Sequence, residues 1–87
     1  MRDRDAHDSV LKADASLDDR QRREWIKYQL RLKDSSMAKI ARRLGVSRQA
    51  VTNALVSPYP RMERAIAYEL GTTPDQLWPE RYVPRKH

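Results

Sequence analysis

The chain has 87 residues, a net charge of +6 at neutral pH, five prolines, two glycines and no cysteine. This length suffices for one small domain, whose core must use most of the apolar side chains. The lack of cysteine excludes disulfides, thiolate metal sites and cysteine nucleophiles. Because no apolar run is long enough to cross a bilayer and the polar N-terminus does not look like a signal peptide, we expect a cytoplasmic protein.

The charge is unevenly distributed along the chain. Residues 1–18 contain 3 basic and 5 acidic side chains, a net charge of −2, whereas residues 19–87 contain 15 basic and 7 acidic ones, a net charge of +8. A basic domain of this size attracts polyanions such as nucleic acids. Many small basic proteins share this balance, so charge alone does not separate a nucleic-acid-binding protein from the others.

The first element after a polar stretch is a helix. Residues 1–17 contain few apolar side chains, which predicts a flexible tail. A helix is expected to start at a capping box formed by Ser16 and Asp19, or at Asp18 as the alternative N-cap, and to end near Lys33. Apolar side chains at helical spacing predict a buried stripe that consists of Trp25, Ile26 and Leu30. Tyr28 and Leu32 lie off this stripe and are expected to be half-buried at its edge.

Two short helices are predicted on either side of Gly45. Ser36, or Ser35, is expected to cap the first of them, and glycine then takes at low cost the left-handed backbone that ends it. Ser47 caps the second helix, which we expect to cover residues 47–56. The inward side chains of the pair are expected to be Ile40, Ala41, Leu44, Val46, Val51, Ala54 and Leu55.

Two more helices complete the expected domain. Pro60 suits the first position of the fourth helix, which Gly71 ends. Thr73 and Pro74 start a short fifth helix, which Pro79 stops. With no repeat and no strand signal, the chain is expected to be an all-α, five-helix domain over residues 18–82, with a flexible tail at 1–17 and a basic tail at 83–87. The buried residues of these two helices are expected to be Met62, Ile66, Leu70, Leu77 and Trp78.

The helix after Gly45 has a polar outer face. Two short helices joined by a tight turn are typical of the helix-turn-helix that reads duplex DNA. Arg48 can donate two parallel bonds to guanine, and Gln49 or Asn53 can pair in a similar way with adenine. Any solvent-exposed helix can also carry such a face, and the turn before it favours DNA. The predicted base-reading residues are Ser47, Arg48, Gln49, Thr52 and Asn53.

Phosphate contacts are expected from residues that flank this reading helix. The preceding helix crosses the DNA backbone in this motif, and its N-terminus can hold a phosphate through backbone N–H groups. For each basic residue, an ordinary solvated face is an equally good explanation. The predicted phosphate-contacting residues are Ser36, Lys39, Arg42, Arg43, Tyr59 and Arg61.

Nothing in the chain indicates catalysis. His7 and His87 are the two histidines and both lie in the tails, so no histidine base or histidine metal site is expected in the core. Both glycines are helix stops, which leaves no glycine-rich phosphate loop. We therefore expect no catalytic residues, no metal, no cofactor and no small-molecule ligand.

Three stretches that follow the helix-turn-helix carry a family resemblance. Residues 57–61 contain a Pro-aromatic-Pro, residues 67–74 are the end of an Ala-containing helix with Leu-Gly, and residues 77–82 read Leu-Trp-Pro-Glu-Arg-Tyr. In these features the chain resembles the Ner family, small regulators of Mu-type transposable phages with bacterial relatives called Nlp. The resemblance covers about residues 25–82. It implies a lambda-repressor-like fold, DNA binding and repression.

The chain also departs from that family pattern. Its N-terminal tail and the Arg-rich start of its first helix are longer than expected, and Arg48 and Gln49 stand where serines are common. The resemblance therefore does not identify the operator.

Together, these features predict a sequence-specific, double-stranded DNA-binding transcriptional regulator, a phage or prophage type of repressor that occupies a promoter. The alternatives on the same fold are a protein-interaction adaptor, for example for a transposase or polymerase, and a non-specific architectural DNA binder. The lack of a heptad repeat favours a monomer in solution that pairs on repeated DNA sites. Such a protein would work at the nucleoid.

Overall fold

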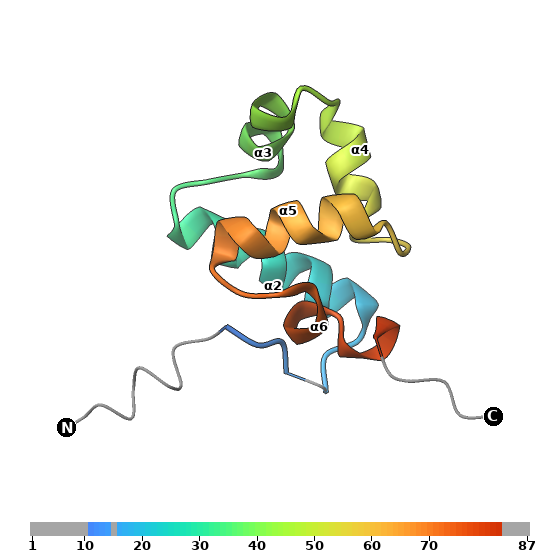
Figure 1. Cartoon of the computed structure of the whole chain (residues 1–87). Helices are drawn as coiled ribbons and strands as arrows, with labels where there is room; N and C mark the ends of the chain where they lie inside the picture. The colour runs from blue at the N-terminus through green and yellow to red at the C-terminus, as the bar shows by residue number, and fades with distance from the viewer. Residues whose placement is uncertain (1–10, 15, 83–87) are drawn as a thin grey trace.

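A computed structural model describes residues 11–14 and 16–82 of the chain. These residues form helices and turns without any strand (Figure 1), which confirms the predicted all-α class. The elements are five α-helices and one 3-10 turn: α2 (Asp19–Leu32), α3 (Met37–Leu44), α4 (Arg48–Asn53), α5 (Pro60–Leu70), α6 (Pro74–Leu77) and η1 (Pro79–Arg81). In the part of the chain that is described, no helix is long and apolar enough to cross a membrane.

The start of α2 is set by a capping box on Asp18. The Asp18 carboxylate accepts from the backbone N–H of Gln21 at 2.8 Å, and the Gln21 side chain accepts from the backbone N–H of Asp18 at 2.9 Å. The alternative cap is therefore correct and the box starting at Ser16 is wrong. The hydroxyl and the backbone N–H of Ser16 both donate to the Asp14 carboxylate at 2.9 Å, so these two bonds tie Ser16 to the preceding turn.

The buried stripe of α2 differs from the prediction. Ile26 and Leu30 are buried as expected, but the third buried residue is Arg22, while Trp25 is half-buried at the edge of the core. The i, i+4 spacing of this stripe turns the other side of the helix to solvent. The half-buried edge positions are therefore wrong, because both side chains are exposed: Tyr28 at 49% and Leu32 at 63%.

The helix-turn-helix is formed by α3 and α4 as predicted. The Ser36 hydroxyl caps α3 by accepting from the backbone N–H of Lys39 at 3.1 Å, and the Ser47 hydroxyl caps α4 by accepting from Ala50 at 3.1 Å. Between them, Gly45 ends α3 with φ 72°, in the left-handed region. Glycine enters this region without the steric cost that a Cβ brings.

The predicted extent of the reading helix, residues 47–56, is wrong. The α-helix ends at Asn53, and the next three residues form a turn in which each N–H bonds the carbonyl three residues back. Ala54 and Leu55 both enter the core there. A helical bond to the Ala54 carbonyl would come from position 58, which is a proline without an N–H. The Arg81 guanidinium donates to this carbonyl instead, at 2.8 Å.

The core lies where α5 crosses the middle of the molecule. Figure 1 shows α5 between the α3–α4 pair above it and α2 with α6 below it. Ile40 and Val51 reach this core from the pair, and Trp78 reaches it from the C-terminal end. The buried positions predicted for the last two helices are confirmed: Met62, Ile66, Leu70, Leu77 and Trp78.

Residues 11–14 lie against the turn between α5 and α6. The backbone N–H of Ala13 donates to the carbonyl of Gln76 at 3.0 Å, and the Thr72 hydroxyl donates to the carbonyl of Leu11 at 2.6 Å. Ala13 is buried. This part of the expected N-terminal tail thus contacts the fold, whereas residues 1–10 and the predicted basic tail at 83–87 lie outside the described residues.

Candidate nucleic-acid interface

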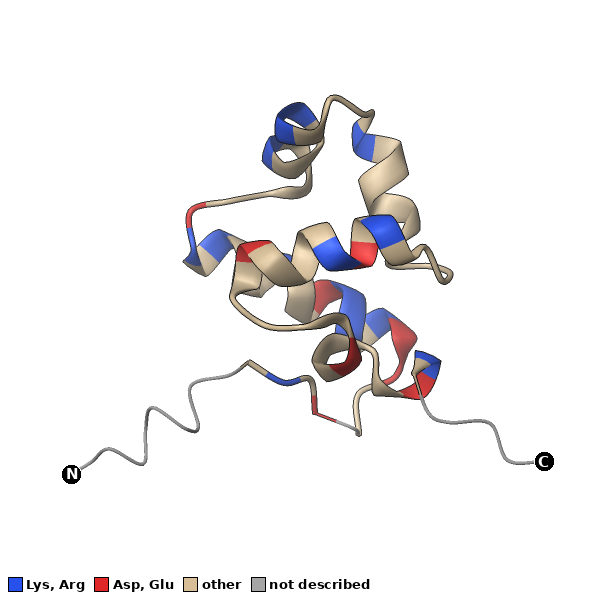
Figure 2. Ribbon diagram, in the orientation of Figure 1, with Lys and Arg blue, Asp and Glu red and all other residues tan. Residues whose placement is uncertain are grey.

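The helix-turn-helix carries basic side chains without acidic ones. Between Asp34 and Glu63 the sequence contains five basic residues and no acidic residue. Figure 2 shows these cationic positions on α3, at the start of α4 and at the start of α5, while the acidic positions lie mainly on α2, α5, α6 and η1. This side of the molecule therefore has the charge that attracts a phosphate backbone.

The outer face of α4 displays the predicted base-reading residues. Arg48, Gln49 and Asn53 are exposed, and Thr52 is half-buried. The Gln49 amide donates to the Asn53 side-chain oxygen at 2.9 Å, which aligns the two amides along the helix. The Thr52 hydroxyl donates to the Arg48 carbonyl at 2.9 Å, so this donor is already used within the helix.

The predicted phosphate-contacting residues are only partly available. Lys39 donates to the carbonyl of Asp34 at 2.9 Å, and the Arg43 guanidinium pairs with the Glu69 carboxylate of α5 at 2.7 Å. Within residues 11–14 and 16–82, the exposed side chains of Arg42 and Arg61 have no hydrogen bond or ion pair. Among the predicted phosphate-contacting residues, these two arginines are therefore the cations that the fold leaves most accessible to a ligand.

Two other members of that set have structural roles. Ser36 caps α3, and Tyr59 is half-buried against the core at the start of α5. Two groups next to Glu69 lower the pKa of its carboxyl. The Ser35 hydroxyl has the larger effect, although its oxygen has no partner within hydrogen-bond limits, and the Arg43 guanidinium has the next largest. The ionised Glu69 carboxylate at neutral pH thus holds Arg43 against α5.

The C-terminal end of α4 is held by three residues, Glu63, Arg81 and Tyr82, which we call the clamp. Glu63 is only 1% exposed, and its carboxylate accepts from the backbone N–H of Tyr59 at 2.7 Å, from Arg81 at 2.9 Å and from the Tyr82 hydroxyl. The same Arg81 nitrogen donates to the Ala54 carbonyl at 2.8 Å. The clamp therefore joins the end of α4, the start of α5 and the C-terminal end of the domain.

Other residues of the segment 77–82 surround the clamp and make further contacts. The Arg81 guanidinium carbon lies 4.9 Å from the centre of the Trp78 ring, within the range of a cation–π contact. Glu80 accepts from the largely buried Arg22 of α2. Burial opposes ionisation of Glu80, but the bond from Arg22 and the nearby cations lower its pKa overall. Burial first, and the bond to Glu63 next, raise the pKa of Tyr82 to about 12.

The sequence prediction missed this buried network. Glu63 follows the buried Met62 and comes one turn before Ile66, so its position beside an apolar stripe is a signal that it is buried. Its partner Arg81 is 18 residues further along, and no local pattern connects the two. Among the described residues, no group of three or more His, Cys, Asp or Glu side chains could hold a metal ion.

Comparison with known proteins agrees with this geometry. Residues 21–87 match the family described as winged helix-turn-helix DNA-binding. The negative regulator of transcription of Escherichia phage D108 is 38% identical over 65 residues, which cover 70% of this chain and 89% of that protein. The phage Mu protein of the same name is 34% identical over 53 residues, covering 61% and 71%. The chain belongs to the Ner-like family.

This Ner-like chain is also similar to a bacterial protein. The sugar fermentation stimulation protein B of Escherichia coli K12 is 49% identical over 59 residues, which are 67% of this chain and 64% of that protein. The chain therefore spans less than two thirds of that relative's length. No solved structure matches the chain significantly.

Family membership confirms the predicted helix-turn-helix class and makes this Ner-like chain a DNA-binding protein rather than an enzyme. The family description includes a wing, but residues 16–82 contain no strand. After the helix-turn-helix, α5, α6 and η1 occupy the described chain instead. The clamp comes from α5, from η1 and from Tyr82 directly after η1.

Proposed function

We propose that this Ner-like chain is a sequence-specific transcriptional regulator that represses by occupying a promoter, with α4 in the major groove. The observation that carries the proposal is the exposed polar face of α4, set in a segment without acidic side chains and held at its far end by the clamp. The two phage relatives named as negative regulators of transcription support repression as the outcome.

Base reading on α4 would use the side chains that keep donors and acceptors available. The guanidinium of Arg48 can donate to O6 and N7 of guanine, and the amides of Gln49 and Asn53 can match adenine. Ser47 accepts a backbone bond and keeps its hydroxyl proton to donate, whereas Thr52 donates its proton to the helix and can still accept. The Thr52 methyl can also contact a thymine methyl.

Phosphate binding would position α4 in the groove without reading sequence. Arg42 and Arg61 are the exposed cations on either side of α4 that are best placed for it. Lys39, Arg43 and Ser36 would need to exchange or share an existing contact, so we expect smaller contributions from them. We expect the same of Tyr59, because its side chain is half-buried against the core.

A gel-shift titration tests the proposal. The intergenic DNA next to the chain's own gene is compared with a random duplex of equal length, at several salt concentrations. Specific regulators bind their sites about 10³-fold or more tighter than random DNA. Equal affinity for both duplexes would support a non-specific architectural binder instead. A weak affinity without a steep loss in salt would support an adaptor.

We further propose a monomer that pairs only on repeated DNA sites. Along residues 16–82 the longest helix is α2 with 14 residues, and it has no heptad pattern. Sedimentation of the free protein at micromolar concentration checks this, and a stable dimer there would contradict it.

A further inference from the structure

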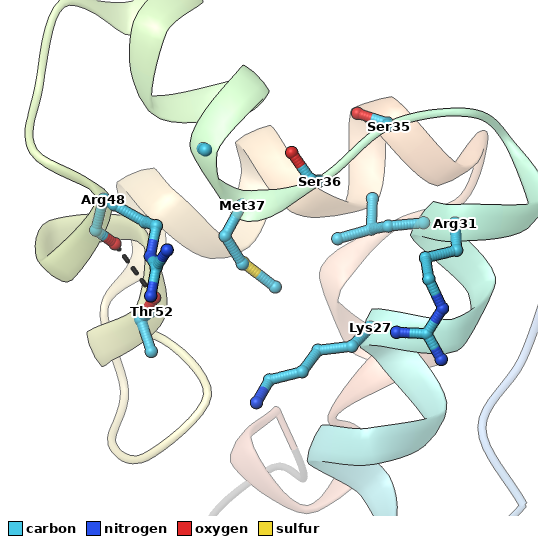
Figure 3. Close-up of a pocket in the computed structure, with 9 residues that line it drawn as sticks. Lys27, Arg31, Ser35, Ser36, Met37, Arg48 and Thr52 are labelled. Carbon is cyan, nitrogen blue, oxygen red and sulfur yellow. Dashed lines mark hydrogen bonds between the residues drawn. The ribbon is translucent and has the colours of Figure 1, made fainter.

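A cavity of about 420 Å³ opens between α2, the start of α3 and the outer face of α4. Figure 3 shows Lys27 extending from α2 into the space toward α4, with the Met37 side chain between them and Arg31 beside Lys27. Arg48 and Thr52 of α4 line the opposite wall. This cavity thus shares two residues with the proposed base-reading face.

The lining of the cavity is cationic on both walls. Its charged residues are Lys27, Arg31 and Arg48, and none of its lining residues is acidic. Lys27 has a competing partner in Glu24 at 3.6 Å, but both side chains are largely exposed and the pair is a weak one. The Arg31 guanidinium lies 5.9 Å from the centre of the Tyr28 ring, an exposed contact that leaves its N–H donors free for another acceptor.

The remaining surface of the cavity suits a sugar-phosphate chain. Leu30 and Met37 form an apolar floor, and Met37 and Ala38 belong to the first turn of α3. The N-terminal end of a helix carries a partial positive charge. An anion with an apolar group attached, such as a phosphate and its deoxyribose, matches both parts of this lining.

We propose that the cavity holds a backbone phosphate of the DNA strand that borders the groove entered by α4, with Lys27 and Arg31 as its donors. The inference rests on the proposed function, because Arg48 and Thr52 place the rim of the cavity at the edge of the reading face. It adds α2 to the DNA interface. Neither Lys27 nor Arg31 reads sequence in this arrangement.

Substitution of the two donors tests the assignment in the full chain. Lys27→Gln and Arg31→Gln remove one charge each and keep much of the side-chain stem. Each phosphate contact contributes about 0.9 to the slope of log affinity against log salt. Affinity falls as the salt concentration rises from 50 to 200 mM. We therefore expect the fold-decrease of each variant to be smaller than that of the wild type by a factor of about 3.5. The weakening should be equal on the intergenic and the random duplex.

Lys33→Gln is the matched control. It removes the same charge from the end of α2, but Lys33 lies beside Gly71 rather than in the cavity. Its salt slope should stay at the wild-type value. Slopes of Lys27→Gln and Arg31→Gln that match this control would overturn the proposal. A loss confined to the intergenic duplex would also overturn it, since that pattern indicates base reading.

The two proposals can fail separately. If the wild type binds both duplexes equally, sequence-specific regulation fails. The salt slopes of the variants on random DNA still decide whether α2 contacts the backbone.

Discussion

The outer face of α4 and its C-terminal end are built from opposite kinds of interaction. On the face, the bonds are local and exposed, since Gln49 bonds Asn53 and Thr52 bonds the Arg48 carbonyl within one helical turn. At the end, the bond is distant and partly buried, because Arg81 reaches the Ala54 carbonyl from 27 residues away. The comparison separates the residues that can vary with the DNA target from those that keep the helix in place.

The two regions should also differ in how much their polar contacts contribute to the stability of the fold. Exposed polar pairs contribute about 0–1 kcal/mol to stability. Removing one partner of a buried pair costs about 3–5 kcal/mol, because the other charge is left buried without a partner. We therefore expect substitutions on the face to change DNA binding, and substitutions in the clamp to change folding.

Glu63→Ala should have the largest effect. It removes the acceptor for Tyr59, Arg81 and Tyr82 and leaves a guanidinium in a largely buried position. The free energy of unfolding should fall by about 3–5 kcal/mol, measured by urea denaturation. Glu24→Ala on the exposed side of α2 is the control and should change it by less than about 0.5 kcal/mol. A similar small change for both would remove the distinction between the two regions.

Arg48→Ala should leave folding intact and change recognition. Its side chain is exposed on α4 and makes no ion pair in the described part of the chain. If it reads a guanine, the difference between the binding free energies for specific and random DNA should shrink by about 1–3 kcal/mol, while the unfolding transition is unchanged. Titration of both duplexes measures this ratio. An equal loss on both would instead place Arg48 on the backbone with Lys27.

Arg42→Ala should have a smaller effect that does not depend on sequence. As an exposed phosphate contact on α3, it should weaken specific and random binding equally and lower the salt slope by about one unit. Affinity measured from 50 to 200 mM salt reports the slope. If the variant lost discrimination instead, the roles assigned to α3 and α4 would be exchanged.

The pH dependence of the clamp is the smallest and most specific prediction. The pKa of Tyr82 is raised to about 12 from an ordinary 10.0, so the folded state keeps the proton that the unfolded state loses first. The contribution to stability is therefore complete below pH 10 and is lost as the pH rises toward 12. Urea denaturation at both pH values should show this loss, and Tyr82→Phe should reduce it. Tyr68→Phe on the exposed side of α5 is the control and should retain it.

Local signals made most of the helix-turn-helix predictable. Ser36, Gly45 and Ser47 act on the backbone within three or four residues of their own position, and each has the predicted role. The bond between Arg81 and the Ala54 carbonyl at the end of α4 was not predictable in this way, because the two residues are 27 positions apart in the sequence.

The stripe of α2 shows why charged residues mislead a pattern. An apolar pattern counts Arg22 as exposed and therefore centres the stripe on Trp25. In the folded chain Arg22 is buried with Glu80 as its partner, and the helix is rotated accordingly. The partner lies 58 residues away, beyond any periodicity of the helix. The same limit applies to Lys27 and Arg31, whose relation to α4 appears only in three dimensions.

The hydrogen bond between Gln49 and Asn53 has a consequence for how such regulators change their targets. The Gln49 amide donates one N–H to the Asn53 side-chain oxygen, so the hydrogen-bonding groups that Asn53 has left for a base depend on the residue at position 49. Substituting either residue alone frees a polar group as well as removing one. A new operator preference in this chain would therefore arise more readily through paired replacements at the two positions than through successive single steps.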